Sequence, residues 1–327
     1  MANASALSPA RLDEVHKVGS AAIRLALVGV GKIARDQHLP ALARNPAFEL
    51  VAAVNRDGPL THVSTFSDIA AMLASGIEVD AVSLCTPPAC RYELAREAIE
   101  AGLHVMLEKP PAASVAEVHD LEQRAQQRGL TLFTTWHSRE AAGVEPAREW
   151  LSERTIESVR VTWKEDIRVW HPGQHWILQA GGMGVFDPGI NALSILTRIL
   201  PDKLTMRSAT LEYPSNWESP IAAEVAMSHG SAARVQASFD FLYSGTPCWD
   251  IEVLTDEQTL LLAEGGSRLY IDEMPHLAAA DQEYARLYQR FAELIAAGNS
   301  DVDSTPLQLV ADAFKLGHRQ QSAAFHF

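Results

Sequence analysis

The sequence predicts an α/β chain in two parts, a doubly wound parallel sheet followed by an α+β domain with an antiparallel sheet. Between residues 23 and 135, short apolar runs alternate with longer amphipathic segments, as in parallel strands joined by helices. Beyond about residue 155, apolar and polar residues alternate in runs separated by turn residues, the pattern of antiparallel strands. A chain of 327 residues is also too long for one ordinary core, which favours two domains.

The predicted strands of the first part are apolar on both faces, as the buried strands of a parallel sheet are. They are IRLALV (23–28), ELVAAV (49–54), DAVSLC (80–85), HVMLE (104–108) and LTLFTT (130–135). The best-marked helix between them starts after Ser114, because Ser114 and Glu117 have the spacing of a capping box. This helix is expected to run to Gly129, a natural C-terminal stop.

The second part is expected to consist mainly of strands and turns. Its strand candidates include SVRVTW, ARVQASFDF, WDIEVL and TLLLAE. Two closing amphipathic segments, residues 281–297 and 306–324, are predicted to be helices, and one of them could pack back on the first domain. We therefore divide the chain into a loose tail over residues 1–22, a first domain over 23–138 and a second domain over 139–327.

Composition argues against several classes of protein. The formal net charge of −14 and the scattered Lys and Arg leave no basic stripe for nucleic acid. No apolar run approaches the roughly 20 residues that span a bilayer, and the N-terminal tail lacks the apolar core of a secretory signal. The three cysteines have no metal-site spacing and fit buried thiols in a reducing cytosol. We expect a cytoplasmic protein with neither a nucleic-acid nor a membrane partner.

The segment GVGKIA (29–34) predicts a nucleotide site, because it follows the first strand and opens a helix. Gly29, Gly31 and Ala34 give the G-x-G-x-x-A form. Glycines at these positions allow a tight turn and let a pyrophosphate approach the amides at the helix N-terminus. We expect the cofactor to contact Gly29, Gly31, Lys32 and Ile33.

The end of the second strand bears on the choice of cofactor. Asn55 stands where an NAD site carries a carboxylate for the ribose 2′-hydroxyl, and Arg56 follows it. Because an arginine accommodates a 2′-phosphate, NADP is the preferred cofactor, and both residues are candidate cofactor contacts. Asp57 keeps NAD possible, since a small shift of the strand end would return a carboxylate to the site. Arg56 could equally be an exposed loop charge.

Ligands of open α/β sheets bind beyond the carboxyl ends of the strands. The segments that follow strands here are CTPP (85–88), EKPP (108–111) and WHS (136–138). We expect cofactor contacts from Thr86, Pro87, Glu108 and Lys109, and a substrate contact from His137. Lys109 is a cation held by two prolines, and its ammonium could bind a reacting hydroxyl or help remove its proton. Standing alone, EKPP would better fit an exposed lysine at a strand end.

The segment KEDIRVWHPGQHW (164–176) concentrates aromatic rings, carboxylates and imidazoles. Apolar ring faces that stack on a sugar, together with polar groups that bind its hydroxyls, are what a polyhydroxylated substrate needs. Glu165, Trp170 and His171 are therefore candidate substrate contacts, although the tryptophans could equally be structural. His171 and His175 could instead bind a metal, but no third ligand stands at a matching spacing, so we expect no metal.

The segment FDPGIN (186–191) is predicted to begin a helix, with Asp187 as the cap and Pro188 at the first helical position. Asn191 then lies one turn later on the same face as Asp187. The preceding GGMG would allow a ligand to approach the backbone closely. Because a helix N-terminus favours negative charge, the cap position is compatible with a catalytic carboxylate.

Four segments, in order, resemble the glucose-fructose oxidoreductase and inositol dehydrogenase family. They are GVGKIARDQHLPAL, SLCTPP, HVMLEKPP and GGMGVFDPGINALSI, and the likeness extends over about residues 23 to 325. The resemblance implies a Rossmann domain, an α+β domain with an open-faced antiparallel sheet, and hydride transfer with NAD(P). It also implies that Lys109 is the catalytic lysine of the family's Glu-Lys-Pro motif and that Asp187 is its catalytic aspartate.

The sequence departs from the commonest family pattern at Asn191, where many members carry a histidine. Asparagine cannot accept a proton in this pH range, so proton removal falls to Asp187 or Lys109, and Asn191 is expected to bind a substrate hydroxyl. The segments TTWHSR, WHPGQHW and FDPGINALSILTRILP are most similar to the bacterial L-arabinose 1-dehydrogenase and D-galactose 1-dehydrogenase branch. This likeness implies oxidation of a cyclic monosaccharide at C1 to a lactone.

Two other functions stay open at this stage. A sugar-responsive regulator could use the same scaffold to bind NAD(P) without catalysis, although the retained lysine and aspartate argue against it. An oxidoreductase of the same family acting on another polyol is the other alternative. A free sheet face usually needs covering, so we also expect a homo-oligomer, either a dimer or a tetramer.

Overall fold

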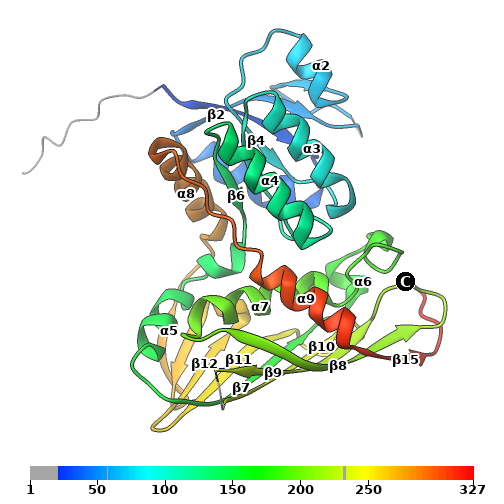
Figure 1. Cartoon of the computed structure of the whole chain (residues 1–327), viewed down its shortest axis with the longest axis vertical. Helices are drawn as coiled ribbons and strands as arrows, with labels where there is room; N and C mark the ends of the chain where they lie inside the picture. The colour runs from blue at the N-terminus through cyan, green and yellow to red at the C-terminus, as the bar shows by residue number, and fades with distance from the viewer. Residues whose placement is uncertain (1–20, 57, 231–232) are drawn as a thin grey trace, which may run out of the picture.

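The computed structural model describes residues 21–56, 58–230 and 233–327, so most of the predicted tail over 1–22 and Asp57 lie outside the described residues. The chain forms two sheets (Figure 1), one of six strands and one of nine. The six-stranded sheet is parallel and flanked by helices, and the nine-stranded sheet is mostly antiparallel. The predicted fold class is confirmed.

The first sheet has the strand order β3-β2-β1-β4-β5-β6. Its strands are β1 (Ile23–Val28), β2 (Phe48–Val54), β3 (Ser64–Phe66), β4 (Ala81–Leu84), β5 (His104–Leu107) and β6 (Leu132–Thr134). The helical segments that follow them are η1 (Ala34–His38), α1 (Leu39–Ala43), α2 (Ile69–Ala74), α3 (Pro88–Glu100) and α4 (Val115–Gln127). The capping box at Ser114 is confirmed, and Gly129 has the left-handed φ of +65° that ends such a helix. Strand β3 was not predicted, because three residues are too few to show a pattern.

The second sheet has the strand order β14-β13-β12-β11-β7-β10-β9-β8-β15. Its strands are β7 (Ile156–Lys164), β8 (Leu204–Pro214), β9 (Ala222–His229), β10 (Ala233–Asp240), β11 (Cys248–Thr255), β12 (Thr259–Ala263), β13 (Arg268–Ile271), β14 (Met274–Ala278) and β15 (His318–Ser322). The prediction of an antiparallel sheet is wrong at two ladders, because β7 pairs with β10 and β8 with β15 in parallel. Alternating residues indicate which face is buried but carry no information about the direction of the neighbouring strand.

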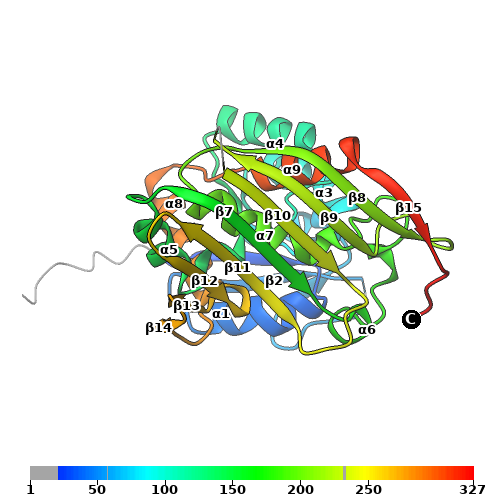
Figure 2. The same cartoon turned by 90° about the horizontal axis from the view of Figure 1, so that it is seen from below.

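Helices cover one face of the second sheet, and the other face is open (Figure 2). The remaining helical segments of this part are η2 (His137–Glu140), α5 (Val144–Leu151), α6 (Ile167–Trp170), η3 (His175–Ile177), α7 (Phe186–Ile199), η4 (Glu264–Gly266) and α9 (Thr305–Leu316). The predicted helix over 306–324 is wrong beyond residue 316, where Gly317 leads into β15. The open face carries exposed polar side chains such as Arg160, Glu224 and Gln236.

Helix α8 (Glu283–Ala297) packs on the first sheet, although it follows the second sheet in the chain (Figure 1). Its buried residues Tyr284, Tyr288 and Phe291 join a core cluster with Leu25 and Met106 of the parallel strands. The helix therefore brings side chains from a late part of the chain beneath the ends of β4 and β5. Helix α9 instead joins the core of the second sheet.

The three cysteines are free thiols, but the expectation that they are buried is wrong. Cys85 and Cys248 are half-buried, and Cys90 is exposed on α3. Within the described ranges, no helix is long and apolar enough to cross a membrane.

Candidate active site

A cleft of about 490 Å³ lies where the carboxyl ends of the parallel strands face loops of the second part. Ten of the predicted site residues line it: Gly31, Lys32, Ile33, Thr86, Pro87, Glu108, Lys109, Trp170, His171 and Asp187. One cavity therefore brings together residues of the glycine loop, of the strand ends and of the second part, which are far apart in the sequence. This is the place where open α/β sheets bind their ligands.

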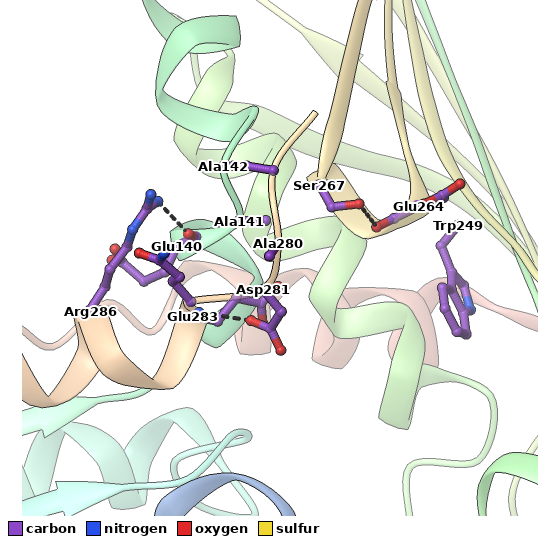
Figure 3. Close-up of a pocket in the computed structure, with 12 residues that line it drawn as sticks. Glu140, Ala141, Ala142, Trp249, Glu264, Ser267, Ala280, Asp281, Glu283 and Arg286 are labelled. Carbon is purple, nitrogen blue, oxygen red and sulfur yellow. Dashed lines mark hydrogen bonds between the residues drawn. The ribbon is translucent and has the colours of Figure 1, made fainter. Parts of the chain in front are cut away.

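Another pocket, of about 410 Å³, lies beside the N-terminus of α8 (Figure 3). Its lining is acidic and includes Glu140, Glu264, Asp281 and Glu283. Figure 3 shows Arg286 close to Glu140, whose main-chain oxygen accepts a hydrogen bond from that guanidinium. None of the predicted site residues lines this pocket, so the chemistry is assigned to the first cleft.

The glycine loop has the shape that a dinucleotide cofactor needs. Gly29 has a φ of +84°, and a Cβ there would lie 2.8 Å from Cγ2 of Thr86, so a larger residue would break the contact between the two loops. A Cβ on Gly31 would meet nothing within 4 Å, which leaves open space at the helix entry. Amide groups at such an entry can receive a pyrophosphate. The residues present thus fit NAD(P).

The two residues after β2, Asn55 and Arg56, have different environments. Asn55 Oδ1 accepts a hydrogen bond of 3.2 Å from the Val30 amide, and its Nδ2 donates to the Gly58 carbonyl oxygen at 2.8 Å. Asn55 therefore braces the glycine loop. Arg56 is exposed, which leaves its guanidinium available to a phosphate beyond the strand end. Neither residue lines the cleft of Lys109.

Lys109, in the loop after β5, meets Asp187 of α7 across the cleft. Lys109 Nζ donates a hydrogen bond of 2.8 Å to the main-chain oxygen of Asp187 and lies 3.5 Å from its Oδ1. The two side chains are 15% and 8% exposed, so their charges are only weakly screened by water. A mostly desolvated ammonium beside a carboxylate can bind a substrate hydroxyl and take part in its deprotonation.

The predicted cap at Asp187 is wrong, because α7 starts at Phe186, two residues before the predicted start. Val185, at the cap position, already has helical φ and ψ. Asp187 is instead in the first turn, where the helix dipole still favours a negative charge. The chain reaches this helix through a crowded entry. A Cβ on Gly184 would lie 2.1 Å from the main-chain oxygen of Pro220, so only glycine fits there.

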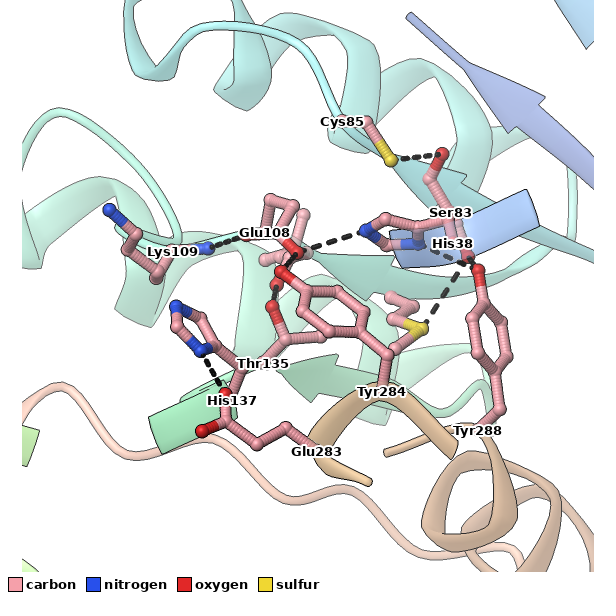
Figure 4. Close-up of polar contacts among 12 residues, drawn as sticks. His38, Ser83, Cys85, Glu108, Lys109, Thr135, His137, Glu283, Tyr284 and Tyr288 are labelled. Carbon is pink, nitrogen blue, oxygen red and sulfur yellow. Dashed lines mark hydrogen bonds and ion pairs between the residues drawn. The ribbon is translucent and has the colours of Figure 1, made fainter. Parts of the chain in front are cut away.

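Glu108 lines the cleft, and its carboxylate also takes part in a buried polar network (Figure 4). Its Oε1 accepts hydrogen bonds from His38 Nε2 at 2.9 Å and from the Tyr284 hydroxyl at 2.7 Å. Its Oε2 accepts from the Lys109 amide at 3.0 Å. On the far side of the imidazole, His38 Nδ1 bonds the Tyr288 hydroxyl at 2.8 Å. The network thus connects α8 with the backbone of the candidate catalytic lysine.

The His38–Glu108 pair is buried, and each group shifts the pKa of the other. Burial opposes the charged form of Glu108, but the hydrogen bond and charge of His38 lower its pKa from 4.5 to about 2. Burial likewise disfavours the His38 cation, yet the neighbouring Cys85, Tyr288 and Glu108 raise the pKa of His38 well above 6.5. Both shifts favour the ionised form of the group concerned.

Glu108→Gln is expected to lower the free energy of unfolding by about 3 kcal/mol at neutral pH, because it leaves a buried imidazolium without its counter-charge. The contribution of Glu108 is present above pH 4.5 and is lost as the pH falls toward 2, since its folded-state pKa is depressed. The contribution of His38 is present below pH 6.5 and is lost as the pH rises through its raised pKa. Urea unfolding at several pH values measures both effects.

The matched control for this experiment is Glu93→Gln, which removes a surface ion-pair partner of Arg96. Its carboxylate is 66% exposed, so the substitution should leave the unfolding curve nearly unchanged. Equal stability of Glu108→Gln and the wild type at neutral pH would show that the network carries no charged pair.

His171 is held in the cleft by Glu165 from behind. His171 Nε2 bonds Glu165 Oε1 at 2.8 Å, and Trp249 Nε1 donates to Glu165 Oε2 at 2.8 Å. Glu165 is 4% exposed, so this residue orients His171 and Trp249, whereas the predicted role was a substrate contact. Trp170 packs edge-on against Trp249, with ring centroids 4.8 Å apart. The sequence reasoning treated Trp249 only as a strand residue.

Like Glu165, two further predicted substrate residues do not line the cleft. His137 Nδ1 bonds Glu283 Oε2 at 2.6 Å, which joins η2 to α8 (Figure 4). Asn191 is half-buried one turn after Asp187 on α7, and its main-chain oxygen accepts a hydrogen bond from Ser194. Among the described residues, no group of His, Cys, Asp and Glu could hold a metal ion.

Residues 23–135 match the oxidoreductase family with an NAD-binding Rossmann fold. Galactose 1-dehydrogenase of Pseudomonas fluorescens is 45% identical over 304 residues, which cover 93% of this chain and 99% of the relative. The crystal structure of D-galactose-1-dehydrogenase protein from Rhizobium etli superposes with a TM-score of 0.90 at 52% identity, over 94% of this chain and 99% of that one. A 3-ketoreductase from Actinomadura kijaniata, solved with NADP, has a TM-score of 0.82 at 19% identity over 92% and 99%, which shows the fold alone.

Proposed function

Because the chain belongs to the oxidoreductase family of glucose-fructose oxidoreductase and inositol dehydrogenase, we propose that it is an NAD(P)-dependent sugar 1-dehydrogenase. The reaction is oxidation of the C1 hydroxyl of cyclic D-galactose, L-arabinose or both to the lactone. The observation that carries this proposal is the Lys109–Asp187 pair, which faces the same cleft as the glycine loop. The identity of 45% over nearly all of a galactose 1-dehydrogenase supports the choice of substrate.

In the proposed reaction, the glycine loop would hold NAD(P)⁺, and the bound cofactor would supply the acceptor for the C1 hydride. Lys109 donates a hydrogen bond to the C1 oxygen and stabilises the negative charge that grows on it. The Asp187 carboxylate accepts the hydroxyl proton. Loss of one hydride and one proton converts the C1 alcohol to the lactone carbonyl, so atoms and electrons balance.

His171 and the Trp170 ring line the same cleft and are proposed to bind the sugar. Glu165 keeps the His171 ring oriented, because one of its oxygens bonds that ring and the other bonds Trp249. Asn191 is proposed to bind a hydroxyl from the next turn of α7. L-arabinopyranose is D-galactopyranose without the exocyclic hydroxymethyl group, so a site that reads the shared hydroxyls accepts both sugars.

A panel of aldoses tests the proposal. Purified protein mixed with NADP⁺ is expected to give reduced cofactor, measured by absorbance, with D-galactose and L-arabinose and much more slowly with their C4 epimers. Lactone or the aldonic acid formed from it should appear in equal amount. Absence of turnover with every sugar would instead favour a regulator that binds NAD(P). Turnover only with other polyols would show an oxidoreductase with a different substrate.

Arg56 is proposed to bind the 2′-phosphate of NADP, which makes NADP the preferred cofactor. Arg56→Ala is expected to lower kcat/KM for NADP⁺ by about 10-fold or more, because a charge-assisted hydrogen bond of about 1.5–3 kcal/mol is lost, and to leave kcat/KM for NAD⁺ almost unchanged. Steady-state kinetics with both cofactors measures the ratio. Arg128→Ala, at an exposed arginine after α4, is the matched control. An unaltered NADP⁺-to-NAD⁺ ratio would remove Arg56 from the phosphate site.

A further inference from the structure

Arg91 is a buried cation whose side chain bonds main-chain oxygens. It lies on the first turns of α3, is 3% exposed, and forms no ion pair with any carboxylate in the described part of the chain. Its Nη1 donates to the main-chain oxygens of Glu108 and Pro110, and its Nη2 donates to that of Thr86. Burial lowers the pKa of Arg91, and the charge of the nearby Glu108 carboxylate acts in the opposite direction.

These oxygens come from the two loops that form the cleft. Thr86 follows β4, whereas Glu108 and Pro110 flank Lys109 after β5. A guanidinium presents its donors in a rigid planar fork, so one side chain fixes the relative position of both loops. Lys109 is thereby held through the residues on each side of it in the chain. On the same segment, its amide is held by Glu108 Oε2.

We propose that Arg91 is a positioning residue that places the Lys109 ammonium against Asp187. The inference rests on the proposed function, because it assigns Arg91 a task in the chemistry of that site. Arg91 has no bond to Lys109 Nζ, and it acts through the backbone of the strand-end loop. A displacement of this loop moves the ammonium away from the 2.8 Å contact that it makes with the Asp187 oxygen.

Arg91→Ala and Arg91→Lys test the inference. Both are expected to lower kcat about 10²-fold, because misplacing a reacting group by about 1 Å has an effect of that size. The dissociation constant for NADP⁺, followed by protein fluorescence, should change less than about threefold if only Lys109 moves. Arg91 lines the cleft, so added guanidinium ion can enter the space left in Arg91→Ala and should restore part of kcat. A lysine has no planar fork, and Arg91→Lys should not recover the rate.

Arg96→Ala is the matched control, since Arg96 is on the same helix with an exposed side chain paired to Glu93 and Glu100. A second readout does not depend on turnover. Labelling of Lys109 by an amine reagent, followed by mass spectrometry, should become faster in Arg91→Ala and stay unchanged in Arg96→Ala. Unchanged labelling together with wild-type kcat would overturn the inference. A wild type that oxidises no sugar would overturn the proposed function instead, and the labelling result would still report on the position of Lys109.

Discussion

Lys109→Met is expected to lower kcat for D-galactose oxidation at least about 10³-fold, with a much smaller change in NADP⁺ binding. Methionine has a similar length and apolar stem but no donor and no charge, so the substitution removes the ammonium and leaves the packing. The lost group stabilises the growing negative charge on the C1 oxygen in a largely desolvated site, where such an interaction is strong. Steady-state kinetics and cofactor titration by fluorescence separate the two effects.

Lys203→Met is the matched control, because Lys203 is exposed between α7 and β8 and does not line the cleft. Its kcat should equal that of the wild type. Lys109→Arg adds a test of geometry, since the charge is kept while the shape of the donor changes, and a large fall is expected. If Lys109→Met retained most of the activity, Lys109 would have no part in the chemistry, and EKPP would have only a structural role at the strand end.

Asp187→Asn is expected to lower kcat about 10²–10⁴-fold, the usual range for loss of a proton acceptor. The variant removes only the carboxylate. The hydrogen bond from Lys109 Nζ is retained, because its acceptor is the main-chain oxygen of Asp187. The lysine therefore stays anchored while the carboxylate is lost. KM for the sugar should change little, since the carboxylate acts mainly in the transition state.

Steady-state kinetics with D-galactose measures the loss. A fall in kcat with little change in KM identifies the Asp187 carboxylate as the proton acceptor. Asp202→Asn, at an exposed aspartate, should behave as the wild type does. If Asp187→Asn kept the rate of the wild type, Lys109 would be the acceptor.

Much of the fold could be predicted because the relevant signals are local. The apolar runs before Gly29, Thr86 and Lys109 predicted three of the strands. The residues that follow these strands were expected in the cleft, and the structure places Thr86 and Lys109 there. The Ser114 capping box is complete within four residues of chain. Patterns of this kind depend on backbone periodicity and capping, which neighbouring residues determine.

The bonding partners of the buried carboxylates could not be predicted, because they depend on contacts between distant segments. Glu165 was expected to touch substrate, but its partner Trp249 lies 84 positions away on β11, and only the register of β7 and β11 brings them together. Glu108 meets His38 across 70 positions and Tyr284 across 176. No local pattern indicates that these side chains bond protein groups.

Arg91 was overlooked for a related reason. It stands on a helix that looks like an ordinary amphipathic segment, and its partners are backbone oxygens that have no signature in the sequence. The available signal was its position within six residues of CTPP, at the first turns of a helix that begins at the cleft. A charged residue at such a helix start faces either solvent or the strand ends, and the fold decides between them.

The central claim is that this chain removes a hydride from C1 of an aldose, and isotope transfer tests it most directly. D-galactose carrying deuterium at C1 is incubated with the wild-type protein and NADP⁺, and the reduced cofactor and the sugar product are examined by mass spectrometry. The account predicts one deuterium in each reduced nicotinamide and a deuterium-free galactonolactone. Deuterium retained at C1 of the product, or transferred only from galactose labelled at C3, would contradict it.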